Sequence, residues 1–190
     1  MRQGRRSASP LLWRGQARAA GRGRPPARPP RTTQLEKQGL TEYQRRAALM
    51  FEATHRGNYF DAFFAAHEAV GAGFRRNGVR VLANLAPIKE NEVILMADEM
   101  TDSLKDRIYE TLACLRDRVG VRSFNLVLYR PPLAPTDESW EGFPVMVRIV
   151  DRGDPSMRTN DFGGMELYAA SVLASDPLRL ARTLREALPE

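Results

Sequence analysis

Two histidines and one cysteine are the chain's candidates for nucleophilic chemistry. A nucleophile needs a neighbouring base or a lowered pKa to act, and both require a partner group close by. His55 and His67 lie twelve residues apart and form no paired motif, and Cys114 has no histidine near it in the sequence. We therefore predict that Cys114 is a small packing residue and that His67 is an exposed or partly packed side chain.

The same residue types bear on metals and on disulfides. Structural metal sites need several Cys or His ligands at short spacings, and no such cluster occurs in this sequence. We predict no bound metal ion and no cofactor. A single cysteine also excludes a disulfide within the chain, which favours a reduced, cytoplasmic setting. No run approaches the roughly 20 apolar residues of a membrane span.

A group of polar residues in the last quarter of the chain has the chemistry to bind an anion, because guanidinium groups match phosphate oxygens in a bidentate geometry. If the strand face that carries Arg148 lines a cleft, the group would hold a phosphate or a nucleotide. If that face meets solvent, Arg148 is only the polar side of an amphipathic strand. The predicted site consists of Arg148, Arg152, Arg158, Asn160 and Asp161.

Charge is concentrated at the start of the chain. Residues 1–33 hold nine arginines and no acid, so the other 20 basic residues face all 23 acids and the remainder is close to −3. This leader, broken by the proline pairs at residues 25–26 and 29–30, is interpreted as a disordered arm or an artefactual upstream extension. A basic arm for nucleic acid or a membrane surface and a mitochondrial-type transit peptide are the two alternatives. We leave the leader out of the fold and do not expect nucleic-acid binding.

Apolar periodicity predicts the elements that position these residues. The pattern is helical from Thr41 to Phe74, with a break around residues 55–58, and a β-hairpin follows over residues 79–85 and 92–97. A helix begins near Thr101 and ends at Gly120. Its apolar stripe is Leu104, Ile108, Leu112, Leu115 and Val119.

The second half of this region predicts two more strands and a last helix. Alternation indicates strands over 123–130 and 143–151, with Trp140 as a core lid in the loop between them. The closing helix begins at residues 175–177, where a capping residue precedes a first-turn proline. Its predicted apolar face is Leu178, Ala181, Leu184 and Leu188. The result is an α+β domain on a mainly antiparallel sheet with flanking helices.

The succession of residues 81–87 (VLANLAP), 91–93 (NEV) and 124–129 (FNLVLY) resembles the C-terminal half of the galactose-1-phosphate (hexose-1-phosphate) uridylyltransferases, which belong to the histidine-triad superfamily. The resemblance covers about 110 residues and depends on the order of elements more than on any one residue. It implies a histidine-triad-like half of a uridylyltransferase fold. The expected organisation is a leader over 1–33, a helical segment over 34–78 and the uridylyltransferase-like domain over 79–190.

The resemblance also implies one ligand contact. The segment from Gly164 to Ala169 resembles the family's Tyr-Glu-Met segment, whose glutamate contacts the hexose of the nucleotide sugar, so Glu166 is the expected counterpart. The alternative is a surface carboxylate at a helix start. The family's second hexose contact, a glutamine, falls at Val172 here, which departs from the pattern.

The larger departure concerns catalysis. The family's nucleophile is a histidine in a His-Pro-His segment of the first half, and neither His55 nor His67 lies in such a segment. The strand that carries metal-binding histidines in some members has none here. We therefore expect no catalytic residue in this chain.

Two functions remain open at this stage. The chain is either a partial uridylyltransferase that binds UDP-hexose or a sugar phosphate, or a non-catalytic interaction module derived from that fold. The parent activity would be nucleotidyl transfer between UDP-hexose and hexose 1-phosphate, as in galactose metabolism. Either function implies a homo-oligomer, most simply a dimer, or a partner subunit with the N-terminal half, because a half-sheet leaves edges that need cover.

Overall fold

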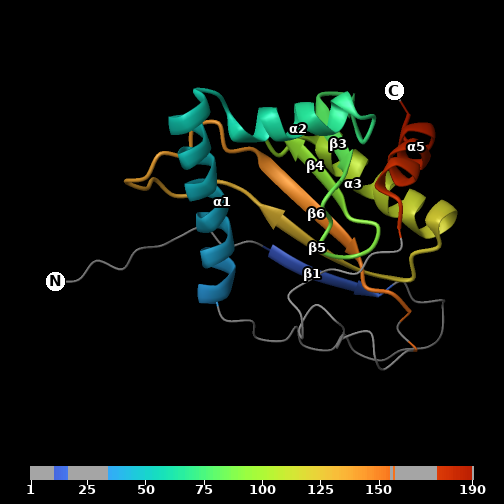
Figure 1. Ribbon diagram of the computed structural model, residues 1–190. Helices are drawn as coiled ribbons and strands as arrows, with labels where there is room; N and C mark the ends of the chain where they lie inside the picture. Colours follow the sequence, from blue (N-terminus) through green and yellow to red (C-terminus); the bar gives the residue numbers. More distant parts are fainter. Residues whose placement is uncertain (1–10, 17–33, 155, 157–174, 190) are drawn as a thin grey trace, which may run out of the picture.

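The computed structural model describes residues 11–16, 34–154, 156 and 175–189, with side chains from Thr41 onward. Its centre is one antiparallel sheet of six strands in the order β1-β5-β6-β4-β3-β2 (Figure 1). The strands are β1 (Leu11–Gln16), β2 (Gly73–Arg76), β3 (Val79–Ala83), β4 (Val93–Ala97), β5 (Ser123–Tyr129) and β6 (Val145–Asp151). The helices are α1 (Gln34–His55), α2 (Tyr59–Ala69), α3 (Asp102–Cys114), the π-helical turn η1 (Leu115–Val119) and α5 (Pro177–Ala187).

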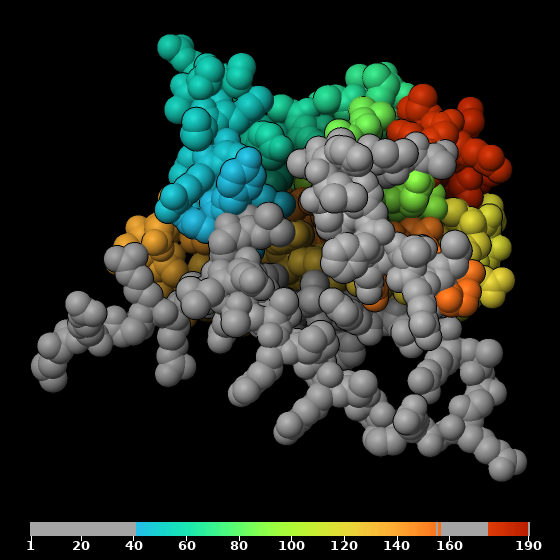
Figure 2. All heavy atoms as spheres, turned by 60° about the horizontal axis from the view of Figure 1, so that its bottom comes forward, coloured from blue at the N-terminus to red at the C-terminus, as the bar shows by residue number. Residues whose placement is uncertain are grey.

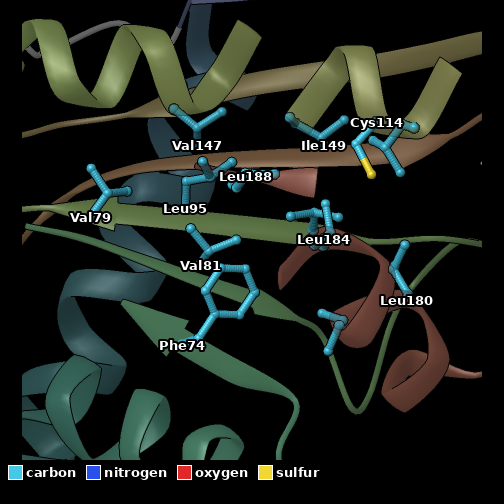
Figure 3. Packing of buried hydrophobic residues seen from close by; sticks show 14 of the residues in the cluster. Phe74, Val79, Val81, Leu95, Cys114, Val147, Ile149, Leu180, Leu184 and Leu188 are labelled. Atoms are coloured by element: carbon cyan, nitrogen blue, oxygen red, sulfur yellow. The ribbon is translucent and has the colours of Figure 1, made fainter. Parts of the chain in front are cut away.

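One face of the sheet packs against α3, η1 and α5. Alternate residues of the strands point to this face, where they pack against the apolar stripes of the helices. Figure 3 shows the sheet residues and the residues of α5 pointing toward one another. The fully or nearly buried members include Val81, Leu95, Val147, Ile149, Leu104, Leu115, Leu180 and Leu184. Each such side chain contributes roughly 1.5–3 kcal/mol to stability.

The opposite face packs against α1 and α2. Leu82, Ile94, Met96 and Met146 come from the sheet and meet Ala48 of α1 and two phenylalanines of α2, Phe60 and Phe64. In the view of Figure 2, the exposed surfaces of α1 and α5 lie at opposite ends of the molecule. Different helices therefore cover the two faces of the sheet.

Capping residues mark the beginnings of α2, α3 and α5 near the positions that the sequence predicts. The Asn58 side chain accepts hydrogen bonds from the backbone N–H groups of Phe60 (2.8 Å) and Asp61 (3.1 Å), which separates α2 from α1. Thr101 caps α3 and Asp176 caps α5 in the same manner. The predicted break at residues 55–58 is confirmed.

The helix predicted from Thr101 to Gly120 forms, but its last turn is π-helical. The backbone widens from Leu115 to Val119 and closes at Gly120, whose φ of 86° is left-handed and favours glycine. The predicted stripe of five apolar residues is confirmed, since Leu104 and Leu115 are buried and the other three pack against the same core.

Three details of the predicted elements are wrong. Residues 73–76 form β2 and not the end of a helix, because α2 stops at Ala69. Phe143, predicted as the first residue of a strand, precedes β6 and packs on the sheet face that α1 and α2 cover. In α5, Leu180 takes the buried place predicted for Leu178, which is 41% exposed.

Residues 11–16, inside the leader that the sequence analysis left out of the fold, form the edge strand β1. It pairs antiparallel with β5 over six residue pairs, from Leu11 opposite Leu128 to Gln16 opposite Ser123. The remainder of the leader lies outside the described residues. Among the helices that the structure describes, none is long and apolar enough to cross a membrane.

Cys114 is the subject of a first prediction. It is 4% exposed, its Sγ lies 3.8 Å from the Thr183 carbonyl oxygen, and burial raises the pKa of the thiol. Because the thiolate is the reactive form, we expect iodoacetamide at pH 8 to modify the folded chain on the order of tenfold or more slowly than the urea-unfolded chain. Mass spectrometry measures the rates. Equal rates would contradict the assignment of Cys114 as a core residue.

Candidate functional site

Polar side chains gather at one end of the sheet face that α1 and α2 cover. Asn84 follows β3, Glu92 precedes β4, Arg148 lies in β6 and Asn125 in β5. The strand registers place all four on the same face as Leu82, Ile94 and Met146. We call this group of four the polar end of the sheet.

An ion pair lies at its centre. Glu92 is 1% exposed, and one carboxylate oxygen pairs with Nε of Arg148 while the other accepts a hydrogen bond of 2.7 Å from the backbone N–H of Ile88. A carboxylate removed from water needs such partners to remain charged. Arg148 is therefore not the solvent-facing polar side of a strand, since it neutralises an internal acid.

Tyr129 adjoins this pair from β5. It is 2% exposed. Burial raises the pKa of its phenol, the positive charge of Arg148 opposes that rise, and the Glu92 carboxylate adds to it. The phenol thus stays protonated at neutral pH beside the guanidinium, where it supplies a polar but uncharged boundary to the polar end.

Asn125 brings an unused acceptor to the same area. Its side-chain oxygen is buried and accepts no hydrogen bond from the described residues. Buried polar atoms are normally satisfied, so an orphaned acceptor marks a place where a ligand donor or a water would bind. Together with the Arg148 guanidinium it gives this end of the sheet the means to contact a polar, anionic molecule.

His67, in α2, lies beside the polar end of the sheet and contacts Leu85, which follows Asn84. It is 4% exposed, and both ring nitrogens are engaged with the backbone. Nδ1 lies 2.8 Å from the Phe63 carbonyl oxygen and donates to it, so Nε2 is the acceptor for the Leu85 N–H at 3.2 Å. The prediction of an exposed or partly packed histidine is wrong: the imidazole is a buried structural link between α2 and the β3–β4 turn.

Of the five residues predicted to bind phosphate, two fall in the described part of the chain. Arg148 takes part in the ion pair above, and the Arg152 backbone N–H donates to the Ser123 carbonyl oxygen at 2.8 Å. The other three, and the predicted hexose contact Glu166, lie outside the described residues. A phosphate site that joins all of them stays a prediction.

Trp140 lies where the loop before β6 meets α1. Its ring packs edge-on against Phe143, and the Arg45 guanidinium lies 5.5 Å above it. Hydrogen bonds from Arg45 lower the pKa of Glu42 from 4.5 to about 2, which keeps that carboxylate charged beside the arginine. The cavity beneath the loop measures only about 10 Å³. This volume holds no more than one water molecule, so Trp140 acts as a lid and not as a stacking surface.

A larger hollow of about 350 Å³ lies on the other side of the sheet. Residues of η1 and α5 line it, including Arg118, Arg179, Asp176 and Thr183. Its arginines make it a second location at which an anion could bind, separate from Arg148. No group of three or more His, Cys, Asp or Glu side chains able to hold a metal ion occurs among the residues that the structure describes.

The fold of this chain is similar to those of solved structures. A uridylyltransferase structure superimposes with a TM-score of 0.62 at 16% sequence identity, over 79% of this chain and 51% of that chain. The chain has a uridylyltransferase fold. A uridylyltransferase mutant structure gives a TM-score of 0.62 at 17% identity, over 78% of this chain and 52% of the other. An ADP-glucose phosphorylase from Arabidopsis thaliana with bound ADP-glucose gives 0.47 at 15% identity, over 86% and 51%.

These likenesses confirm the predicted α+β class and the uridylyltransferase fold. The chain spans about half the length of the uridylyltransferase structures that it matches. No family model matches the sequence, and no curated protein does either. The galactose-1-phosphate family and the assignment to its C-terminal half remain predictions.

Sequence reasoning missed the acid of the ion pair and the role of His67. His67 does follow Phe60 and Phe64 at spacings of seven and three, so the helical period alone could have placed it on the buried face. Glu92 carried no such signal, because its partner lies 56 residues away. Only the antiparallel register of β4 and β6 brings the two together.

Replacing His67 tests its structural role. We expect His67→Ala to lower the free energy of unfolding by about 1–3 kcal/mol, since the Leu85 N–H loses its acceptor and the buried imidazole is removed. Urea unfolding measures the change. His55→Ala, at an exposed histidine, is the control and should stay within about 0.5 kcal/mol. Equal effects would contradict the role given to His67.

The ion pair gives a second prediction. Arg148→Met leaves the Glu92 carboxylate buried without its cation, and breaking such a pair typically costs about 3–5 kcal/mol. Glu92→Gln combined with Arg148→Met removes both charges and should recover much of that loss in urea unfolding. Arg116→Ala, at an exposed arginine paired with Asp117, should change little. A double variant no more stable than the single one would show that the charges are not coupled.

Proposed function

We propose that this chain is a partial uridylyltransferase-like protein that binds a nucleotide sugar or sugar phosphate and does not catalyse transfer by itself. The parent reaction would be nucleotidyl transfer between UDP-hexose and hexose 1-phosphate. Another chain would supply the missing half and its nucleophile. Galactose metabolism and a cytoplasmic location belong to the same proposal.

The main support for this proposal comes from the surroundings of the two histidines. Uridylyl transfer through a covalent intermediate needs an imidazole nitrogen that is free to attack a phosphorus atom. His67 has both nitrogens bonded to the backbone, and His55 is an exposed residue at the end of α1 whose ring lies 4.4 Å from that of Phe51. The chain contains no third histidine. The engaged nitrogens of His67 and the position of His55 at the exposed end of α1 support the proposal that another chain supplies the nucleophile.

The polar end of the sheet supports the binding part of the proposal. Arg148 supplies a guanidinium whose side chain is 19% exposed, and Asn125, on the adjacent strand, supplies an acceptor that no described residue uses. A phosphate would contact the arginine, and a sugar hydroxyl or base N–H would donate to the amide oxygen. Arg152, Asn160, Asp161 and Glu166 remain proposed contacts of the same ligand.

A second function, that of a non-catalytic interaction module, is favoured by exposed apolar side chains. Tyr43 and Met50 of α1 are 69% and 73% exposed, and their seven-residue spacing puts them on one face of the helix two turns apart. Leu133, in the loop before β6, is 80% exposed. Such residues suit a protein partner better than a small polar ligand.

Isothermal titration of the full chain with UDP-glucose and with UDP tests the proposal. We expect heat from at least one of them in the wild type. Glu92→Gln combined with Arg148→Met, which keeps the interior neutral, should weaken binding at least several-fold because the ligand loses its cation. Glu166→Ala should weaken UDP-glucose more than UDP, because a hexose contact is absent from UDP.

Matched controls locate the ligand. Arg179→Ala removes an arginine of the hollow beside α5, and Glu186→Ala removes an exposed carboxylate of the same helix; neither should alter the heat. Loss of heat with Arg179→Ala alone would move the site to that hollow. Absence of heat in the wild type would leave only the interaction module. A covalent uridylyl group on His55 or His67, detected by mass spectrometry, would overturn the non-catalytic part.

A further inference from the structure

Residues 84–92 form the turn between β3 and β4, and its end residues, Asn84 and Glu92, belong to the polar end of the sheet. Two ionisable side chains hold the backbone of this turn. His67 accepts the Leu85 N–H at 3.2 Å, and Glu92 accepts the Ile88 N–H at 2.7 Å. The conformation of the turn therefore depends on acceptors that a proton removes or weakens.

The backbone contacts of His67 determine which of its nitrogens carries the proton. The Phe63 carbonyl oxygen, 2.8 Å from Nδ1, can only accept, so Nδ1 is protonated and Nε2 offers its electron pair to the Leu85 N–H. An imidazolium ion carries a proton on both nitrogens. In that form the bond to Phe63 persists, whereas Nε2–H and the Leu85 N–H are two donors facing each other. Protonation of the ring thus breaks the link to the turn.

The imidazole is closely packed. His67 is 4% exposed, and its ring centroid lies 4.4 Å from that of Phe63. On the side of β2 the backbone of Gly73 is so near that a Cβ built there would lie 3.3 Å from the His67 Cβ. The ring cannot turn toward another acceptor without displacing these neighbours.

The charged groups around His67 do not offer it a replacement partner. Arg75 lies over the Phe64 ring, 4.6 Å from its centroid, and Arg185 donates to the carbonyl oxygens of Gly71 and Gly73, both at 3.1 Å. Within the described residues, no hydrogen bond or ion pair joins His67 to a charged side chain of the surrounding elements. These side chains are Glu68 of α2, Arg75 of β2, Arg185 of α5, and Lys89, Glu90 and Glu92 of the turn.

We propose that the His67–Leu85 hydrogen bond is a pH-dependent link that holds the β3–β4 turn when the imidazole is neutral and releases it when the imidazole is protonated. The linked form carries one proton fewer than the released form, so lowering the pH favours release. Histidine is the side chain that most often changes charge between about pH 5 and 8. Release affects the Leu85 end of the turn, since Ile88 keeps its bond to Glu92.

The turn borders the polar end of the sheet, so its release changes the shape of the proposed ligand site. We expect acid to weaken ligand binding there through His67. This consequence rests on the proposed function, whereas the release of the turn does not.

Amide hydrogen exchange of the full chain, followed by NMR at about pH 7.5 and pH 5.5, tests the proposal. After correction for intrinsic exchange rates, we expect the protection of the Leu85 N–H to fall roughly 2- to 10-fold as His67 gains its proton, because one hydrogen bond is lost. The Ile88 N–H is the internal reference and should keep its protection. Nitrogen chemical shifts of the imidazole report the Nδ1–H tautomer and the protonation of His67 in the same sample.

Three variants separate the titration of His67 from its packing. His67→Gln provides an amide oxygen that accepts the Leu85 N–H and does not titrate, so Leu85 protection should be equal at both pH values. His67→Ala should leave Leu85 weakly protected at both. His55→Gln, at an exposed histidine, should behave as the wild type does. If the glutamine variant does not fold, the wild type and His67→Ala still decide the outcome.

Leu85 protection that stays constant while His67 gains its proton would overturn the proposal. A ring that remains neutral until the chain unfolds in acid would overturn it as well. Titration with UDP at both pH values is a separate readout: binding that weakens at low pH in the wild type but not in His67→Gln would link the turn to the ligand site. Absence of heat at both pH values would count against the proposed function and would leave the exchange result unchanged.

Discussion

Strands β3 and β4 are buried along their whole length, on both faces of the sheet. A charged or polar side chain that is buried on them or at their ends needs a partner from the protein, because it has lost its contacts with water. Arg80 of β3 does so by pairing with Asp61 of α2 at 2.5 Å and with Asp98 beyond β4 at 3.3 Å. Glu92 does so through Arg148 and the Ile88 N–H. The α1–α2 cover and the polar end of the sheet both follow from this constraint.

This constraint explains what the sequence predicts well and what it does not. Apolar periods and capping residues are local features. Short stretches of sequence therefore suffice to predict the hairpin, the helix from Thr101 and the capped start of α5. The α+β class follows from their order. The partner of Glu92 could not be found in that way, because a lone glutamate before an apolar run has the same appearance whether it ends in solvent or inside.

Errors of face assignment have a related cause. Leu178 and Leu180 both fit an apolar face within one turn of α5, and only the position of the helix on the sheet decides which is buried. The prediction for His67 depends on the chemistry of its side chain, whereas its helical spacing from Phe60 and Phe64 places it on their buried face. For the candidate site, Arg148 was found from its residue type, whereas Glu92, Tyr129 and Asn125 needed the strand registers.

The arginines seated along β2 also limit how large an assembly built through this sheet can become. A sheet with two open edges recruits neighbours on both sides and grows into filaments, whereas one with a single receptive edge is satisfied by one neighbour. Arg185 and Arg76 occupy the β2 edge, and the edge strand on the opposite side of the described sheet is β1. Association by edge pairing should accordingly stop at a closed pair, which protects a chain rich in β-strands from fibrous aggregation.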